Sequence, residues 1–193
     1  MVKIDPKEIK GPWDRGYVLD RHTISSTMIG YNEFGHPEFD TQRSELGELV
    51  YRLKYKRDES VIESIAETTT QFLKTVGICP NVIVPMPPSK QRPAQPMFEI
   101  SSALGRALNI PTDTRSVSKL RSTPQMKDIG DFSERAAALK GAFMIGDDLA
   151  GKNVLLIDDL LQSGASMMVV AELIKVQGRA KALYVLALTR TRS

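Results

Sequence analysis

Two adjacent acids stand out within the stretch from Asn153 to Ser166, NVLLIDDLLQSGAS. The apolar run before them needs no polar partner on either face, which predicts a buried parallel strand over residues 153–157. Asp158 and Asp159 follow that run directly. Carboxylates at the end of such a strand suit the hydroxyls of a sugar, either directly or through a divalent metal with oxygen ligands.

The loop after the acids has the composition of a phosphate cradle. Gly164 lets the backbone approach a ligand closely, and the run after it predicts a helix over residues 166–177. The N–H groups and the dipole at the start of a helix favour an anion. Two acids followed by this loop therefore predict a sugar-phosphate site. The alternative is an α/β core that carries an aspartate-rich turn.

This stretch resembles the 5-phosphoribosyl-1-diphosphate (PRPP) signature of type I phosphoribosyltransferases: a hydrophobic strand, two acids, two variable residues and a Thr/Ser-Gly-x-Thr/Ser loop. The resemblance implies that Asp158 and Asp159 are catalytic residues that contact the ribose 2- and 3-hydroxyls. It also implies a Mg²⁺ cofactor, which these acids reach indirectly through ribose or water. The 5-phosphate would bind the loop of Gln162, Ser163, Gly164, Ala165 and Ser166. The family usually has a hydroxyl residue at the position of Gln162, so one side-chain donor has changed.

A proline-rich loop with two cations, VPMPPSKQRPAQP, runs from Val84 to Pro96. It lies between a predicted strand over 82–86 and a predicted helix over 97–108, so it should open at the same sheet edge as Asp158. A rigid loop with a lysine and an arginine suits a diphosphate, and the alternative is a basic surface turn. The resemblance implies a diphosphate-binding role for Pro88, Ser89, Lys90 and Arg92.

Residues 119–133 are polar and lack apolar periodicity, and the segment RSTPQMKDIGDFSER at 121–135 carries several cations. In the family, a flexible loop in this part of the chain closes over PRPP and excludes water. The resemblance therefore implies that Arg121, Gln125 and Lys127 approach the leaving diphosphate. The alternative is a surface connection that ends in a short helix capped by Ser133.

A narrower resemblance covers the chain from about Leu46 to Thr189. The order LKYKRDES, IVPMPPSKQRP, STPQMKD…SERAAALKGAF and VLLIDDLLQSGAS is similar to the ComF branch of the phosphoribosyltransferase superfamily. ComF proteins often begin with a four-cysteine zinc ribbon, whereas this chain has only Cys79. The first 40 residues must do something else, either as a hood over the base site or as an oligomer contact. A homodimer is thus a candidate assembly.

Strands that alternate with helices predict an α/β fold, a doubly wound and mostly parallel sheet of the type I phosphoribosyltransferase kind. Residues 1–40 are expected to form an irregular N-terminal extension in which LDRHTISSTMIGY pairs back after a turn. Residues 41–193 are expected to form the phosphoribosyltransferase domain. Its remaining elements are a helix over 41–58 with Thr41 as N-cap, a helix over 60–75, and strands over 112–118 and 182–188.

Composition sets broad limits on function. A chain of 193 residues suits one domain with a full core, and its single cysteine excludes an internal disulfide or a cysteine-based zinc site. Neither an apolar leader nor a spanning apolar run is evident, so we expect a cytoplasmic protein without a membrane segment. We assign no role to His22 or His36, because neither lies near a motif.

Basic residues with interleaved tyrosines gather in and before YRLKYKRD. This pattern fits a nucleic-acid patch, or a solvated helix face whose tyrosines pack inward. The net charge of +3 suits anionic substrates without demanding nucleic acid. The residues of this basic cluster are Arg43, Arg52, Lys54, Lys56 and Arg57, with Tyr51 and Tyr55.

The sequence therefore predicts a phosphoribosyltransferase that moves a phosphoribosyl group from PRPP to an unidentified acceptor and releases diphosphate. One alternative is a protein that senses PRPP or a nucleotide and has lost transfer activity. Another is a DNA-handling partner that uses the YRLKYKRD face, since ComF relatives are associated with DNA uptake. Salt-sensitive binding to single-stranded DNA would distinguish the latter.

Overall fold

The computed structural model describes residues 1–88, 95–120, 134, 138–139, 141–146 and 149–191. Its centre is a sheet with the strand order β1-β2-β9-β8-β5. All neighbouring strands in it are parallel except β1, which runs antiparallel to β2. This arrangement confirms the predicted α/β fold with a mostly parallel sheet. The strands are β1 (Lys7–Glu8), β2 (Arg15–Arg21), β5 (Val82–Pro85), β8 (Asn153–Leu161) and β9 (Ala182–Arg190).

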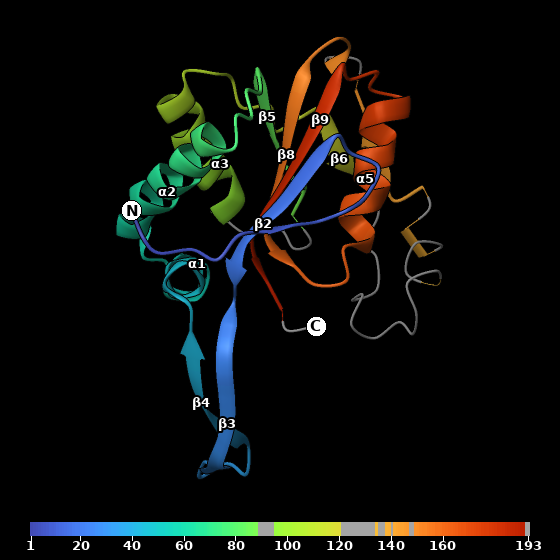
Figure 1. Ribbon diagram of the computed structural model, residues 1–193. Coiled ribbons are helices and arrows are strands. Elements are labelled where there is room, and N and C mark those ends of the chain that lie inside the picture. The colour runs from blue at the N-terminus through green and yellow to red at the C-terminus, as the bar shows by residue number, and fades with distance from the viewer. Residues whose placement is uncertain (89–94, 121–133, 135–137, 140, 147–148, 192–193) are drawn as a thin grey trace.

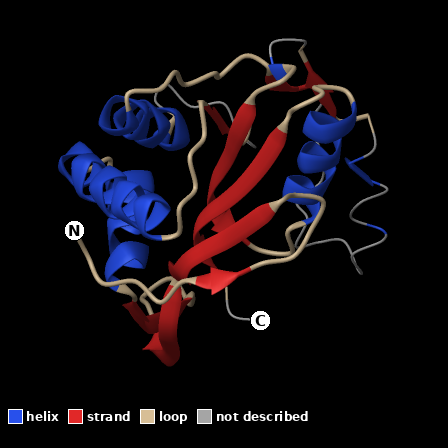
Figure 2. Ribbon diagram, turned by 45° about the horizontal axis from the view of Figure 1, so that its top comes forward, coloured by secondary structure: helices blue, strands red, loops and turns tan. Residues whose placement is uncertain are grey.

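Helices cover both faces of this sheet, as Figures 1 and 2 show. On one face lie α1 (Glu45–Lys56), α2 (Ile62–Thr75, after a 3₁₀ turn η1 at Glu59–Val61) and α3 (Pro96–Leu108), and on the other lies α5 (Ala165–Val176). Side chains of β8 alternate between two cores: Val154 and Leu156 pack on the α5 side, Leu155 and Ile157 on the side of α1 to α3. The sheet is therefore doubly wound, as predicted.

Residues 15–21 depart from the irregular extension that we expected. They form β2, which pairs with β9 from Arg15–Tyr184 to Arg21–Arg190. Within β2, Val18 and Leu19 are fully buried in opposite cores. Only two consecutive strongly apolar residues lie there between charged ones, so the sequence pattern was too short to indicate a buried strand. The separate role expected for residues 1–40 stays a prediction.

The predicted two-stranded excursion is confirmed as a hairpin of β3 (Thr23–Tyr31) and β4 (Pro37–Arg43). It projects from the body of the molecule at the end of β2 (Figure 1). The Asn32 side chain closes its turn by accepting the N–H groups of Phe34 and His36. Ser44, not the expected Thr41, caps α1, because Thr41 is used in β4, where it pairs with Ser26.

The start of α1 packs very closely on the junction between β2 and β3. The Ser44 hydroxyl accepts the Gly47 N–H and donates to the Arg21 carbonyl oxygen. A Cβ atom at Gly47 would lie 2.3 Å from the backbone oxygen of His22. Glycine at this position therefore lets α1 dock, and the docking fixes where the later residues of the helix project.

The remaining described segments are short. A two-stranded antiparallel sheet joins β6 (Val117–Lys119) and β7 (Phe143–Ile145). The strand expected over 112–118 is interrupted, because the Asp113 side chain accepts the N–H groups of Arg115 and Ser116 and turns the chain. The capping role predicted for Ser133 lies outside the described residues. Within the described part of the chain, no helix is long and apolar enough to cross a membrane.

We predict that Gly47→Ala destabilises the protein although alanine is the better helix former. The new methyl group would meet the His22 carbonyl oxygen, so α1 must shift from the sheet. The free energy of unfolding should fall by about 1–3 kcal/mol, as for other overpacked sites. Chemical denaturation measures this, with Lys56→Ala in the last turn of the same helix as the control. Equal stability of the Gly47→Ala protein and the wild type would contradict the close docking.

Candidate functional site

The candidate site lies where β8 extends beyond the end of its neighbour β5. Pairing of β8 with β5 ends at Pro85–Ile157, after which the Met86 N–H donates to the Ile157 oxygen at 2.8 Å. Pairing with β9 continues to Leu161–Arg190. The predicted end of the strand at residue 157 therefore marks the end of β5, and β9 keeps β8 extended for another four residues. Asp158 is the first residue of β8 that is open on the β5 side.

The two acids have different surroundings. Successive side chains of a strand point to opposite faces, so Asp159 lies on the side of α1 and Asp158 on the side of α5. Lys54 of α1 places its Nζ 2.7 Å from Oδ2 of Asp159. Oδ1 of Asp158 accepts the Asp159 N–H at 2.9 Å. Asp159 is thus fixed by an ion pair, whereas Asp158 is held by its neighbour's backbone.

Burial and the nearby Asp159 carboxylate raise the pKa of Asp158 to about 8. A carboxyl group with a raised pKa takes up a proton at a higher pH than an ordinary aspartate does, and in that form it can donate as well as accept a hydrogen bond. The side chain is still partly exposed. It is therefore both accessible to a ligand and sensitive to the charge that the ligand brings.

The loop after β8 opens a helix without a side-chain cap. Gly164 is the N-cap residue of α5, with φ of 76°, a conformation that favours glycine. The Ser163 hydroxyl reaches the Ala165 N–H only at 3.4 Å, and no acidic residue lies in the first turn. The first N–H groups of a helix lack partners within the helix, so this turn is suited to an anion. The predicted 5-phosphate loop, Gln162 to Ser166, thus begins where β8 ends, with two residues between it and Asp159.

Other predicted site residues are only partly placed. Pro88 follows β5 at the same sheet edge as Asp158. Ser89, Lys90 and Arg92 of the diphosphate loop lie outside the described residues, as do Arg121, Gln125 and Lys127 of the flexible loop. Their assigned roles stay predictions.

Sequence reasoning missed a hydrogen-bonded chain that reaches Asp159. The Thr189 hydroxyl donates to the Asp159 carbonyl oxygen at 2.9 Å, and its oxygen lies 3.1 Å from Nδ1 of His22. Because Thr189 has a single hydroxyl hydrogen, His22 must donate from Nδ1, which leaves Nε2 as an acceptor. Burial, followed by the charges of Arg43 and Lys54, lowers the pKa of His22. His22, to which we assigned no role because no motif lies near it in the sequence, thus lies one hydrogen bond from a residue that contacts Asp159.

A usable signal for these residues was present. Thr189 follows the apolar run of β9, and His22 follows shortly after the apolar residues of β2, as Asp158 follows that of β8. Polar residues at the ends of parallel strands gather at one edge. Lys54 lies beside the buried stripe of Val50 and Leu53 on α1, which directs it toward the sheet.

The basic cluster mostly serves contacts within the chain. The Arg43 guanidinium lies 3.6 Å from the centre of the Tyr51 ring, and Arg52 pairs with Asp58. Tyr55 is 63% exposed, so the interpretation that both tyrosines pack inward is wrong; Leu46, Val50 and Leu53 do so instead. With Lys54 also paired, these residues give little support to a nucleic-acid patch.

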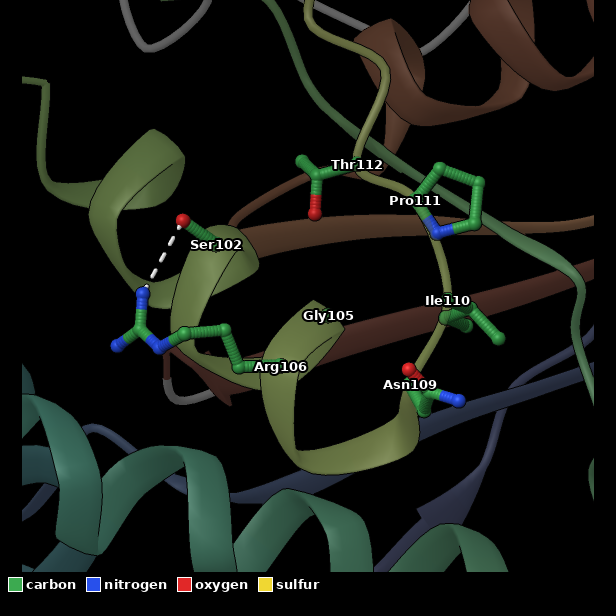
Figure 3. A pocket seen from close by; sticks show the side chains of 7 residues that line it. All are labelled: Ser102, Gly105, Arg106, Asn109, Ile110, Pro111 and Thr112. Carbon is green, nitrogen blue, oxygen red and sulfur yellow. Dashed lines mark hydrogen bonds between the residues drawn. The ribbon is translucent and has the colours of Figure 1, made fainter.

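A hollow elsewhere on the molecule offers less chemistry (Figure 3). It lies between α3 and the segment 109–112, which runs beside β5 through a bridge from Thr112 to Ile83. Its cation, Arg106, is already bound to Glu63 at 2.9 Å and to the Ser102 hydroxyl at 3.3 Å. The hollow is remote from the turn between β8 and α5, and we assign it no function.

No protein-family model and no curated protein matches this chain. Among solved structures it is similar to adenine phosphoribosyltransferase from Thermoanaerobacter pseudethanolicus, with 14% identity, 86% of this chain and 95% of that chain covered, and a TM-score of 0.46. It is similar to a hypoxanthine phosphoribosyltransferase from Staphylococcus aureus, with 17% identity, coverage of 68% and 64%, and a TM-score of 0.44. With UMP synthase from Leishmania donovani the identity is 16% and the TM-score 0.42, over 86% of this chain. The chain spans only 28% of that enzyme's length.

We predict that Asp158 makes the protein less stable as the pH rises. Its pKa is raised from 3.8 to about 8, so the folded state holds this proton more tightly than the unfolded state. The resulting stabilisation is complete below about pH 4 and is lost as the pH rises toward 8, a change of about 1–3 kcal/mol for a partly exposed group. Denaturation of wild type and Asp158→Asn across this range measures the difference.

Subtracting the curve of Asp158→Asn removes the contributions of the other acids. The carboxyls of Asp14, Asp58 and Asp113 have lowered pKa values. Their titration therefore changes the stability of the protein only below about pH 4, where stability is lost as the pH falls. Parallel curves for wild type and Asp158→Asn between pH 4 and 8 would show that Asp158 titrates normally.

Proposed function

We propose that this protein is a phosphoribosyltransferase that binds PRPP at the carboxyl edge of β8. One observation carries the proposal: Asp158, an acid with no neighbouring strand on the β5 side, lies on the strand that leads into a helix start without a side-chain cap. A sugar hydroxyl and a phosphate are the two groups that this pair suits. The likeness to the ComF branch rests on sequence motifs alone, and the acceptor is unidentified.

The residues have distinct roles in the proposed reaction. The N–H groups from Ser163 to Ser166 hold the 5-phosphate, and Asp158 meets the ribose hydroxyls. The bond between ribose C1 and the diphosphate oxygen breaks with the electron pair leaving on diphosphate, and the acceptor's lone pair forms the new bond to C1. Fixed acids close to the ribose favour the positive charge that develops on the ring. Lys90 and Arg92 of the proline-rich loop stabilise the leaving diphosphate, the role that the motif implies.

The described residues fit a magnesium ion only as an indirect ligand set. Among them, no group of three or more His, Cys, Asp or Glu side chains could hold a metal by itself. Asp158 and Asp159 supply carboxylate oxygens, the donor type that Mg²⁺ prefers, and would reach it through ribose or water. When bound with PRPP, magnesium neutralises charge on the diphosphate.

The hairpin of β3 and β4 has an exposed apolar face that can serve as a contact between two copies of the chain. Along β3 and β4 the register puts Met28, Phe39, Tyr31 and Pro37 on one face, and Glu38 and Asp40 on the other. Met28, Phe39 and Tyr31 are 45%, 53% and 68% exposed. A two-stranded ribbon is marginal in water without cover. The four residues of this apolar face carry no charge, so two copies can meet there without repulsion while their acidic faces stay in solvent. We therefore propose a homodimer with two-fold symmetry through this face.

We predict that PRPP with Mg²⁺ binds the wild type and that Asp158→Ala weakens binding at least about tenfold, the effect of losing a buried partner of a sugar hydroxyl. Isothermal titration calorimetry measures this. Glu172→Gln, which changes one exposed carboxylate on α5, is the control and should bind like wild type. No wild-type binding at millimolar PRPP would mean that the loop serves another ligand.

The same protein preparation distinguishes the alternative functions. Release of diphosphate with one member of a panel of purine, pyrimidine and amine acceptors would establish transfer. Binding of PRPP without release would favour a sensing protein. Salt-sensitive binding to single-stranded DNA, without PRPP binding, would favour the DNA-handling alternative.

For the dimer, we expect sedimentation equilibrium to show two copies per particle in the micromolar range. The double variant Met28→Ser/Phe39→Ser should be monomeric, because it removes apolar area from the paired faces. The control Asp40→Ser changes the acidic face of the same strand and should remain dimeric. A monomeric wild type, or a dimer that survives the double substitution, would overturn this assembly.

A further inference from the structure

An ionised carboxylate is a poor electrostatic neighbour for a polyanion. A sugar phosphate brings negative charge to the edge that holds both acids. Asp158 can be protonated there because its pKa is raised, whereas Asp159 is held in an ion pair, and like charges in a partly buried site repel strongly. Such a site needs compensation from nearby cations. The structure shows one at Asp159, and it comes from a helix 105 residues earlier in the chain.

The cation is Lys54, whose Nζ lies 2.7 Å from Oδ2 of Asp159. The two side chains are only 23% and 16% exposed, so their attraction is weakly screened by salt. The backbone around each partner is fixed. Val50 and Leu53 bury α1 in the core, and the Asp159 carbonyl accepts the Thr189 hydroxyl. The ion pair of Lys54 and Asp159 is therefore held in place by the fold, unlike an ion pair between mobile surface side chains.

Asp158 has no equivalent partner among the described ion pairs of the chain. Its carboxylate lies on the opposite face of β8, and within the described ranges the hydrogen bond it accepts comes from the backbone N–H of Asp159. The two acids look equivalent in the sequence, but their different partners in the structure give them different roles. One is neutralised and tied to α1, and the other remains for a ligand.

We propose that Lys54 is a positioning residue of the sugar-phosphate site. By neutralising Asp159, Lys54 lets the acid pair receive an anionic sugar, and it leaves Asp158 as the acid that meets the sugar hydroxyls. This inference rests on the proposed function, since it requires a phosphorylated sugar at this edge. It adds a residue of the N-terminal half to the site, and it assigns different roles to Asp158 and Asp159.

The test uses ribose 5-phosphate with Mg²⁺ in titration calorimetry. Lys54→Met should weaken binding at least about tenfold, because it leaves an uncompensated, mostly buried carboxylate beside the ligand. Lys54→Arg should stay within about threefold of wild type, because it keeps the charge. Lys56→Met removes the same charge from an exposed position in the same helix turn and should bind like wild type.

A double variant separates charge compensation from direct contact. If Lys54 acts by neutralising Asp159, Lys54→Met/Asp159→Asn removes both charges and should recover binding to within about fivefold of wild type. If Lys54 instead contacts the phosphate, the double variant should bind as weakly as Lys54→Met. Asp159→Asn alone is the reference for the double variant, because it shows what the loss of this carboxylate costs while Lys54 is kept.

The outcomes distinguish the two levels of the proposal. Wild-type binding with an unchanged Lys54→Met, or a double variant that shows no recovery, overturns the role of Lys54 and leaves the sugar-phosphate site intact. Absence of wild-type binding to both ribose 5-phosphate and PRPP overturns the proposed function, and this inference with it. Thermal unfolding of each variant shows whether a loss of binding reflects a loss of fold.

Discussion

The parallel pairing of β8 with β9 beyond the end of β5 is the constraint on which the candidate site depends. It keeps the chain extended through Asp158 and Asp159, and so directs one side chain to each face of the sheet. It also sets where the turn to α5 begins, and hence where the uncapped N–H groups of that helix lie. A strand that ended with β5 would leave both acids in a loop without fixed directions.

The N-terminal half of the chain completes this edge. β2 adds a strand beyond β9, and His22 at its end contacts Thr189. α1 docks on the same junction through Gly47, and this docking carries Lys54 to Asp159. Segments more than 100 residues apart in the sequence therefore meet at one site. A fold in which the N-terminal segment were a detached extension could not make these contacts.

Much of the fold and of the candidate site could be predicted from the sequence, because the elements concerned are marked by local patterns. The apolar run of β8, the acid pair within the strand and the glycine after it form one local pattern. The helices α2 and α3 have long apolar stripes, which are also local patterns. The strand β2 was not predicted, because its burial depends on pairing with β9, a partner about 170 residues away in the sequence. The roles of Lys54, Thr189 and His22 could have been predicted only in part. Their places at strand ends and beside a buried helix stripe indicated this edge of the sheet, but only tertiary packing brings them together around Asp159.

The central claim is that a sugar phosphate binds at the turn between β8 and α5. Backbone amide NMR of the ¹⁵N-labelled protein during titration with ribose 5-phosphate and Mg²⁺ tests it most directly. The account predicts that the largest shifts fall on the amides of Ser163, Gly164, Ala165 and Ser166, with smaller ones at Asp158 and Asp159. Shifts centred on the hollow beside α3, at Arg106 and Asn109, or no shifts at millimolar ligand, would contradict it.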